Sequence, residues 1–254
     1  MDLGLKNKVA IVTGSGSQIG FGKGIALALA AEGCDLVIAD LNLEGAKKTA
    51  AEIVALKHQA IAVKVDISKL PEVNDMVKIS LDKFGKVDIL VNNAGTSAKP
   101  KPFLEMTEAE WDLDINVNLR GVLNCTKAIL PHMISRKYGK VISISSGVGV
   151  TGMPMEPVYA AAKAGIIAFT KSMAKAMISQ GIYFNNVAPG VGDTGLLRIS
   201  QMPPDFIERV VKTVPLGRAT TPQDIGNIIA YLASDISSDI VGQTFSVDGG
   251  VLML

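Results

Sequence analysis

A tyrosine and a lysine stand four residues apart, at Tyr159 and Lys163, in an alanine-rich stretch. If that stretch is a helix, the spacing puts both side chains on one face. A free phenol has a pKa of about 10, so proton transfer near neutral pH requires a neighbour that favours the phenolate. A lysine ammonium has that effect, because an opposite charge stabilises the ionised form. The pair therefore predicts acid–base chemistry at a substrate oxygen.

Two more polar residues extend this pattern. Ser146 lies thirteen residues before Tyr159, directly after an apolar run. A hydroxyl there could hold a substrate oxygen and stabilise negative charge that develops on it. Asn118 falls in a helical pattern, where asparagine is mildly unfavourable and calls for a reason. Each of the four has an ordinary structural alternative, such as a solvated lysine or a turn serine, but their joint occurrence favours a catalytic site.

A glycine-rich segment, residues 13–24, runs from a predicted strand into a predicted helix. Glycines there permit a tight turn and let the backbone approach a pyrophosphate at the helix N-terminus. Asp40 stands twenty residues beyond Gly20, where a carboxylate can accept ribose hydroxyls and repels a 2′-phosphate. The combination predicts NAD as the cofactor. Asp66 ends the third predicted strand and is expected to receive the adenine amino group, with Ile67 packing on the ring.

The elements that must position these residues are strands that alternate with longer amphipathic stretches. Apolar runs predict seven strands, at residues 8–13, 35–39, 60–65, 87–91, 141–144, 182–187 and 244–247. Near-continuous apolar strands separated by helices predict a parallel sheet covered on both faces. The fold class is thus α/β, a single-domain, doubly wound, Rossmann-type sheet of seven parallel strands with helices on both faces, spanning residues 1–254. Ligands then bind at the carboxyl ends of the strands, and residues 190–215 are expected to form a mobile substrate lid.

Helix starts are marked by Thr107 with Glu110, a capping box, and by Thr221 before Pro222. A helix is also predicted over residues 43–56.

Composition excludes several classes of protein. The 254 residues carry 25 Lys+Arg against 24 Asp+Glu, and this near-neutral balance argues against a dedicated nucleic-acid binder. Cys34 and Cys125 are too few and too far apart for a disulfide framework or a multi-cysteine metal site, so no metal is expected. No secretory signal or membrane-length apolar run is present, which favours a cytoplasmic protein without membrane contact.

The chain resembles the short-chain dehydrogenase/reductase family from Lys8 onward. Six ordered motifs carry the resemblance: Asn92-Asn93-Ala94-Gly95, Asn118-Leu119-Arg120-Gly121, Ser145-Ser146, Tyr159 to Lys163, Pro189-Gly190 and Asp248-Gly249-Gly250. The resemblance implies a catalytic tetrad of Asn118, Ser146, Tyr159 and Lys163. It further implies that Lys163 bonds the nicotinamide ribose and that Asn118 anchors a proton-relay water. It also implies a homotetramer, assembled through the helices of Asn118 and Tyr159 and the C-terminal strand.

Residues for the two ligands follow from the resemblance and the strand ends. The cofactor is expected to contact Gly14, Ser17, Gln18, Gly20, Phe21, Asp40, Leu41, Asp66, Ile67, Asn93, Ala94, Gly95, Tyr159, Lys163, Pro189, Gly190, Gly192 and Thr194. A mainly apolar substrate is expected to contact Ser146, Val148, Met153, Met155, Tyr159, Leu196, Leu197, Met202 and Phe206, because methionines adapt to irregular apolar ligands.

Three features depart from the family pattern. The phosphate loop has two extra residues between Gly14 and Gly20, so the segment Ser15 to Gln18 has two competing registers. Phe21 stands where a smaller aliphatic residue is common, and Gly192 stands where a branched residue is often found.

The leading hypothesis is an oxidoreductase that transfers a hydride between NAD and a secondary alcohol or ketone. The alternative is a reductase of 3-oxoacyl thioesters carried on an acyl carrier or CoA; such enzymes usually prefer NADPH, and Asp40 counts against that. A non-catalytic dinucleotide-binding regulator ranks lowest, because it predicts loss of Tyr159 or Lys163 and both are present.

Overall fold

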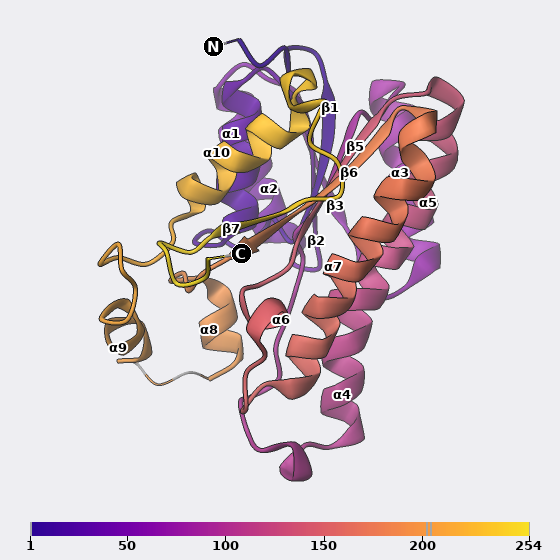
Figure 1. Cartoon of the computed structure of the whole chain (residues 1–254). Coiled ribbons are helices and arrows are strands. Elements are labelled where there is room, and N and C mark those ends of the chain that lie inside the picture. The colour runs from indigo at the N-terminus through magenta and orange to yellow at the C-terminus, as the bar shows by residue number, and fades with distance from the viewer. Residues whose placement is uncertain (1, 202, 204, 254) are drawn as a thin grey trace.

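One parallel sheet forms the centre of the molecule in the computed structural model, which describes residues 2–201, 203 and 205–253 (Figure 1). Its order is β3-β2-β1-β4-β5-β6-β7, and every described strand pair is parallel. The strands are β1 (Val9–Thr13), β2 (Asp35–Asp40), β3 (Ala60–Lys64), β4 (Ile89–Asn92), β5 (Gly139–Ile144), β6 (Ile182–Pro189) and β7 (Thr244–Val247). The predicted seven-stranded Rossmann-type sheet is confirmed, with strand ends shifted by one or two residues.

Helices cover both faces of the sheet. On one face lie α1 (Phe21–Ala31), α2 (Leu43–Ala55) and α10 (Pro222–Ala233), and on the other lie α3 (Leu70–Phe84), α5 (Gly121–Arg136) and α7 (Pro157–Met177). Helix α4 (Glu108–Asp114) continues through a π-helical segment, Ile115–Arg120, into α5. Three short helices lie beyond the carboxyl ends of the strands: α6 (Val148–Thr151), α8 (Gly195–Ile199) and α9 (Phe206–Val211) (Figure 1).

The alternation of side chains along the strands builds two hydrophobic cores. Ala10 and Val12 of β1 point to the core under α1 and α10, whereas Val9 and Ile11 point to the core under α3 and α5. Because side chains of a strand alternate between faces, a strand buried on both sides must be apolar throughout. This is why the strands were recognisable as unbroken apolar runs.

Both predicted helix starts are confirmed. The side chain of Thr107 accepts a hydrogen bond from Glu110 N, and that of Thr221 accepts one from Asp224 N, each within a complete capping box. No helix in the described part of the chain is long and apolar enough to cross a membrane.

The strand order reverses direction beside β1, which pairs with β2 on one side and with β4 on the other. At such a switch point the loops after neighbouring strands leave in opposite directions and open a crevice for a ligand. The segment predicted as a lid, residues 190–215, follows the carboxyl end of β6, and its described part includes α8 and α9.

Candidate active site

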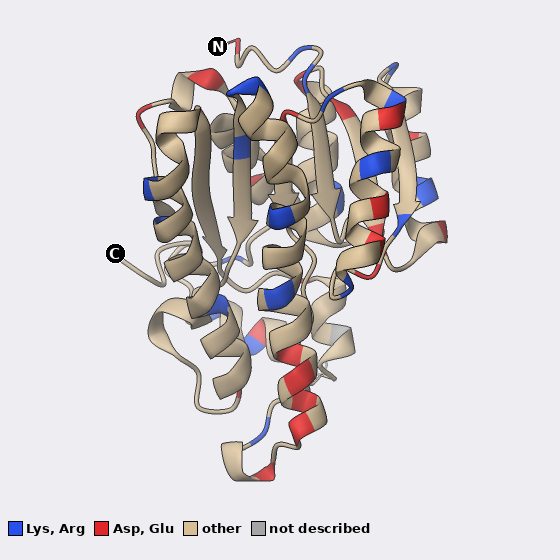
Figure 2. Cartoon of the chain, turned by 90° about the vertical axis from the view of Figure 1, so that its right-hand side faces the viewer, with Lys and Arg blue, Asp and Glu red and all other residues tan. Residues whose placement is uncertain are grey.

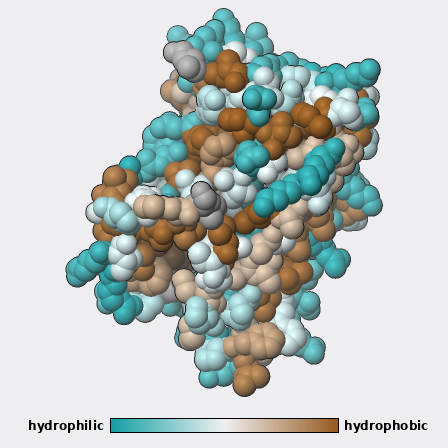
Figure 3. Space-filling view, in the orientation of Figure 1, coloured by the Kyte–Doolittle hydropathy of each residue, from teal (hydrophilic) through white to brown (hydrophobic). Residues whose placement is uncertain are grey.

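A large cleft of about 1050 Å³ lies at the carboxyl ends of the strands, and Figure 3 shows hydrophobic residues around the hollowed part of this face. Its walls come from the loops after β1, β2, β3, β4, β5 and β6, together with α7, α8, α9 and residues 248–252. The sheet therefore gathers into one space segments that lie far apart in the sequence.

The floor of the cleft is a junction between the loops after β1 and β4. Thr13 Oγ1 accepts hydrogen bonds from the backbone N–H groups of Asn93 (3.0 Å) and Ala94 (3.1 Å). The Asn93 amide in turn donates to the carbonyl oxygens of Thr13 (2.9 Å) and Gly14 (3.0 Å). A Cβ on Gly14 would lie 2.5 Å from Ala94 Cα, so only glycine permits this close approach.

The structure explains how the phosphate loop accommodates its two extra residues. Ser15 is buried and donates to the carbonyl of Val12 (2.7 Å), while Gly16 packs so closely on α2 that a Cβ on Gly45 would lie 2.3 Å from Gly16 O. Ser15 and Gly16 therefore pack against β1 and α2 and do not line the cleft, whereas Ser17 lines it beside Gly20. The register left open by the sequence is set by contacts with α2.

The two other departures from the family pattern compensate each other. A Cβ on Gly192 would lie 2.5 Å from Cζ of Phe21, so the large ring occupies the space that a branched side chain at position 192 would need. Both residues line the cleft. The aromatic surface of Phe21 takes the place of the missing aliphatic group in this wall.

Asp40 lies at the end of the cleft where β2 stops. Its Oδ2 accepts from Gly16 N (2.7 Å) and its Oδ1 from Asn42 N (2.8 Å), which fixes the orientation of the carboxylate. Each carboxylate oxygen retains a further acceptor site, because an ionised carboxylate offers about four. Asp66 lies two residues past the end of β3, and its Oδ1 accepts from the Ser68 hydroxyl (2.6 Å). That hydrogen bond is the main cause of a lowered pKa at Asp66.

Tyr159 and Lys163 lie one helical turn apart on α7, and both are buried. Lys163 Nζ donates to the carbonyl oxygen of Ile144, at the end of β5 (3.0 Å), and lies 5.6 Å from the centre of the Tyr159 ring. Burial lowers the pKa of Lys163 to about 8. An ammonium that is buried in this way, facing a cleft, is poised to bind an acceptor or to stabilise a negative charge.

Ser146 lies beside the tyrosine at the end of β5, and its Oγ accepts from Val148 N (3.2 Å). Burial is the main reason why the pKa of Tyr159 is raised, and the charge of Glu156 raises it further. Hydrogen bonding with the Ser146 side chain acts in the opposite direction and lowers it. Burial thus favours the neutral phenol, and a positive charge or a strong acceptor beside the hydroxyl would favour loss of the proton.

Asn118 does not line the cleft, but it holds in place the loop after β4, which does. It lies in the π-helical segment, fully buried, and its amide donates to the carbonyls of Thr96 and Asp114 (2.8 Å each). Its Oδ1 accepts from Thr96 N (3.3 Å), so the side chain holds the loop after β4 from both directions. A Cβ on Gly95 would lie 2.9 Å from Asn118 Oδ1 and 3.3 Å from Lys163 Nζ. Glycine thus lets Asn118 and Lys163 meet across this loop.

Most of the predicted ligand contacts are brought together. The predicted contact residues that line the cleft are Gly14, Ser17, Gly20, Phe21, Asp40, Leu41, Asp66, Ile67, Asn93, Ala94, Gly95, Ser146, Val148, Met153, Tyr159, Lys163, Pro189, Gly190, Gly192, Thr194, Leu196, Leu197 and Phe206.

Three predicted contacts are not among them. Gln18 turns away, because its amide donates to the carbonyls of Gly16 (3.0 Å) and Gly45 (3.1 Å) and so braces the loop against α2. Met155 is 43% exposed and lies outside the cleft wall. Met202 lies outside the described residues.

Sequence reasoning missed several lining residues. Glu156 and Ser97 enter the wall next to Tyr159, and Asp248 and Leu252 close it from the C-terminal side. The Asp248 carboxylate accepts from Gly250 N (3.0 Å) and Leu252 N (2.9 Å), which turns the chain back over Gly147. The spacing of Glu156, three residues before Tyr159, was the one local signal available.

Comparison with known proteins now identifies the family. A family model described as enoyl-(acyl carrier protein) reductase matches residues 14–252. The chain belongs to the short-chain dehydrogenase/reductase family. This family, together with relatives named 3-oxoacyl reductases, makes the chain an oxidoreductase that acts on CH–OH or ketone groups, and this confirms the class of enzyme predicted from the motifs.

Individual relatives cover nearly the whole chain. A 3-oxoacyl-[acyl-carrier-protein] reductase of Synechocystis is 40% identical over 251 residues, covering 98% of each chain. A (2S)-[(R)-hydroxy(phenyl)methyl]succinyl-CoA dehydrogenase subunit of Thauera aromatica is 37% identical and also covers 98% of each chain. The crystal structure of a 3-ketoacyl-(acyl-carrier-protein) reductase from Brucella melitensis, complexed with NADH, superposes with a TM-score of 0.91 at 34% identity, covering 98% of this chain and 100% of that one. These names favour the thioester alternative as the substrate class.

Proposed function

We propose that the protein interconverts 3-hydroxyacyl and 3-oxoacyl thioesters with NAD(H) as the cofactor. The observation that carries this is one cleft with Tyr159, Lys163 and Ser146 in its wall and the carboxylate of Asp40 at the end of β2. Relatives that act on acyl thioesters support the substrate class, and Asp40 supports NAD(H) over its 2′-phosphorylated form.

The residues present fit a dinucleotide. Gly14, Ser17 and Gly20 line the cleft where the chain enters α1, so the backbone at this helix N-terminus is open to phosphate groups. Asp40 would accept from the ribose hydroxyls with its remaining lone pairs, and Asp66 with Ile67 would hold the adenine. When bound, the nicotinamide supplies or accepts the hydride.

The chain itself handles the proton. During reduction Tyr159 donates its hydroxyl proton to the substrate oxygen, and Lys163 stabilises the phenolate that results. Ser146 holds the same oxygen while negative charge develops on it. Asn118, by holding Thr96, keeps the loop next to Lys163 in place, and we assign the anchoring of a relay water to this region.

Two assays test the proposal. With acetoacetyl-CoA as substrate, we expect kcat/KM for NADH to exceed that for NADPH by at least about tenfold, because a carboxylate near the 2′-phosphate is repulsive. Asp40→Asn removes the charge and should bring the ratio of kcat/KM for NADH to kcat/KM for NADPH closer to one. A protein that prefers NADPH would contradict the role of Asp40. A protein that ignores acetoacetyl-CoA but oxidises simple secondary alcohols would restrict the function to the leading alcohol dehydrogenase hypothesis.

We further propose a cytoplasmic homotetramer. Apolar side chains on the outer face of α5 support this, since Leu123 is 39% and Ile134 38% exposed. Figure 2 shows that charges are sparse along much of this helical side and gather in an acidic group at α4. Light scattering coupled to gel filtration should give four times the mass of the chain, and a monomer would contradict the assembly.

A further inference from the structure

Glu156 lines the cleft beside Tyr159, and neither cofactor binding nor proton transfer as proposed above uses its carboxyl group. Glu156 is the N-cap residue of α7, three residues before Tyr159. It shares the wall with the apolar side chains of Leu113, Val148 and Met153. Asp40, which marks the cofactor side, is the last residue of β2, whereas Glu156 lies at the start of α7.

Only one of its two carboxyl oxygens is engaged within the described chain. The buried hydroxyl of Ser97 donates to Glu156 Oε1 at 2.9 Å. No described residue donates to Oε2, and no described lysine, arginine or histidine lies within 4 Å to pair with the carboxylate. Burial raises the pKa of Glu156, the Ser97 hydrogen bond lowers it, and the nearby charge of Asp114 raises it again. Glu156 is thus held in place by Ser97 with one acceptor left open.

A half-satisfied carboxyl group in a largely apolar wall is costly without a partner. Glu156 is only half-buried in the cleft wall, and no described lysine, arginine or histidine forms an ion pair with it, so its second oxygen is open to the cleft. What enters the cleft beside it gains most if it brings a hydrogen-bond donor. A substrate carboxylate would be repelled by Glu156 and by Asp114 behind it.

We propose that Glu156 is a specificity-determining residue whose open carboxyl oxygen binds a hydrogen-bond donor on the substrate, beyond the reacting carbon. The inference rests on the proposed function: in an acyl thioester of the pantetheine type, that donor is the amide N–H nearest the sulfur. Glu156 then recognises the thiol arm, while Ser146 and Tyr159 hold the ketone oxygen.

A pair of short thioesters isolates this contact. S-acetoacetyl-N-acetylcysteamine carries the amide, whereas S-butyl acetothioacetate lacks it and keeps the same reacting ketone. With NADH, we expect wild-type protein to favour the first in kcat/KM by about tenfold, the worth of a hydrogen bond to a charged acceptor. Glu156→Leu should bring the ratio to about one. Glu156→Gln, whose amide oxygen still accepts, should keep part of the preference.

Controls separate recognition from general damage. Met153→Leu alters the same wall without touching the acceptor and should keep the wild-type ratio. Glu156→Asp, which keeps the charge but shortens the side chain, should lower the ratio even if Glu156→Leu does not fold. An unchanged ratio in Glu156→Leu, or no preference in the wild type, overturns the proposal. Wild-type protein that reduces neither thioester but oxidises a secondary alcohol overturns the proposed function instead.

Discussion

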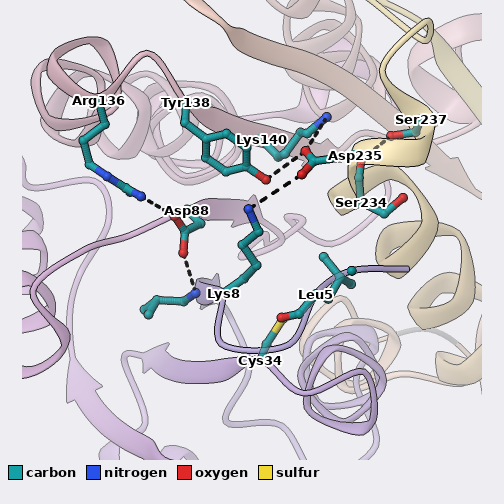
Figure 4. A network of polar contacts seen from close by, with 12 residues as sticks. Leu5, Lys8, Cys34, Asp88, Arg136, Tyr138, Lys140, Ser234, Asp235 and Ser237 are labelled. Carbon is teal, nitrogen blue, oxygen red and sulfur yellow. Dashed lines mark hydrogen bonds and ion pairs between the residues drawn. The ribbon is translucent and has the colours of Figure 1, made fainter. Parts of the chain in front are cut away.

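Two buried lysines lie at opposite ends of strand β5, and their surroundings differ. Lys163 reaches the last carbonyl of the strand, Ile144 O, and faces the cleft. Lys140 is the second residue of the strand, is 1% exposed, and lies in the polar network of Figure 4. Burial lowers the pKa of both side chains. Only at Lys140 does a carboxylate counteract the effect.

Side chains from distant segments of the chain surround Lys140. Asp235 lies 3.6 Å from Lys140 Nζ and 3.7 Å from Lys8 Nζ, and it accepts from the Tyr138 hydroxyl at 3.0 Å (Figure 4). The ring of Tyr183 covers Lys140 Nζ at 3.7 Å. A neighbouring carboxylate, Asp88, is part of the same end of the sheet. These contacts tie β5 to the first strand and to the segment after α10.

The difference separates a structural charge from a functional one. The fold itself supplies Lys140 with a carboxylate, Asp235, and an aromatic ring, Tyr183, although its Nζ has no hydrogen-bond partner among the described residues. Lys163 donates to a backbone carbonyl, but burial is the sole influence on its pKa and no carboxylate offsets it, so a counter-charge must come from a ligand or from an ionised Tyr159. A buried charge that lacks a counter-charge and lines a cleft is typical of a functional site.

The sharpest way to break this comparison is Lys163→Met. We expect kcat/KM for ketone reduction to fall by about 10²- to 10⁴-fold, the range typical of lost acid–base catalysis. The free energy of unfolding should stay within about 1 kcal/mol, because the variant removes an uncompensated buried charge. Chemical denaturation alongside steady-state kinetics measures both. A large loss of stability with retained activity would reverse the roles assigned to the two lysines.

The variant Asp88→Asn tests the structural role of the charged residues at the Lys140 end of the sheet. Asp88 accepts from Val9 N (2.9 Å) and pairs with Arg136 (2.8 Å) and Lys86 (3.1 Å). Burial alone would raise the pKa of Asp88, but these partners together hold it below its usual value. We expect the variant to lose about 3 kcal/mol of stability, since it strands buried partners. Activity per folded molecule should not change.

The pH dependence of the free energy of unfolding follows from the lowered pKa of Asp88. A carboxyl group with a lowered folded-state pKa contributes stability above its unfolded pKa and loses that contribution as the pH falls through the folded value. Wild-type protein should therefore lose stability below about pH 4 more steeply than Asp88→Asn. Parallel acid-dependence of the two proteins would show that Asp88 is not the group responsible.

Lys163 predicts a second rise of stability with pH, at high pH. Its folded-state pKa of about 8 lies below the unfolded value of about 10.4, so the unfolded state binds more protons between them. The free energy of unfolding should then rise as the pH increases through this window. Lys163→Met should flatten the rise, whereas Lys140→Met should leave much of it. Urea denaturation at intervals from pH 7 to about 10.5 gives both curves.

The smallest expected effect is at Glu156→Gln. Because the charge of Glu156 raises the pKa of Tyr159, its removal should lower that pKa. The rise of kcat/KM for alcohol oxidation with pH, which reports formation of the phenolate, should move to lower pH. Ser146, Lys163 and Asp114 also act near this hydroxyl, so their unchanged presence makes the shift modest. A midpoint unchanged or shifted upward would contradict the influence of Glu156.

Local spacing explains what could be predicted from the sequence. Tyr159 and Lys163 are one helical turn apart, and Asp40 follows its strand directly, so short segments sufficed to recognise them. The apolar runs likewise predicted the sheet, because strands buried on both faces admit few polar residues.

What escaped prediction depends on contacts between distant segments. The register of the phosphate loop is set by Gly16 against Gly45, and the space at Gly192 is filled by Phe21. An acid at a helix start is ordinary, so the spacing of Glu156 before Tyr159 was too weak a signal until its cleft position and its hydrogen bond from Ser97 were visible. Gln18 was misplaced because its bracing role requires α2 beside the loop.

The central claim is that Tyr159 performs the proton transfer in an NAD(H)-dependent reaction. Tyr159→Phe keeps the ring and removes only the hydroxyl, and its binding of NADH can be measured by fluorescence titration beside single-turnover reduction of acetoacetyl-CoA. We predict a dissociation constant for NADH within about threefold of wild type and a reduction rate at least about 10³-fold lower. Turnover at the wild-type rate, with NADH bound, would contradict the account.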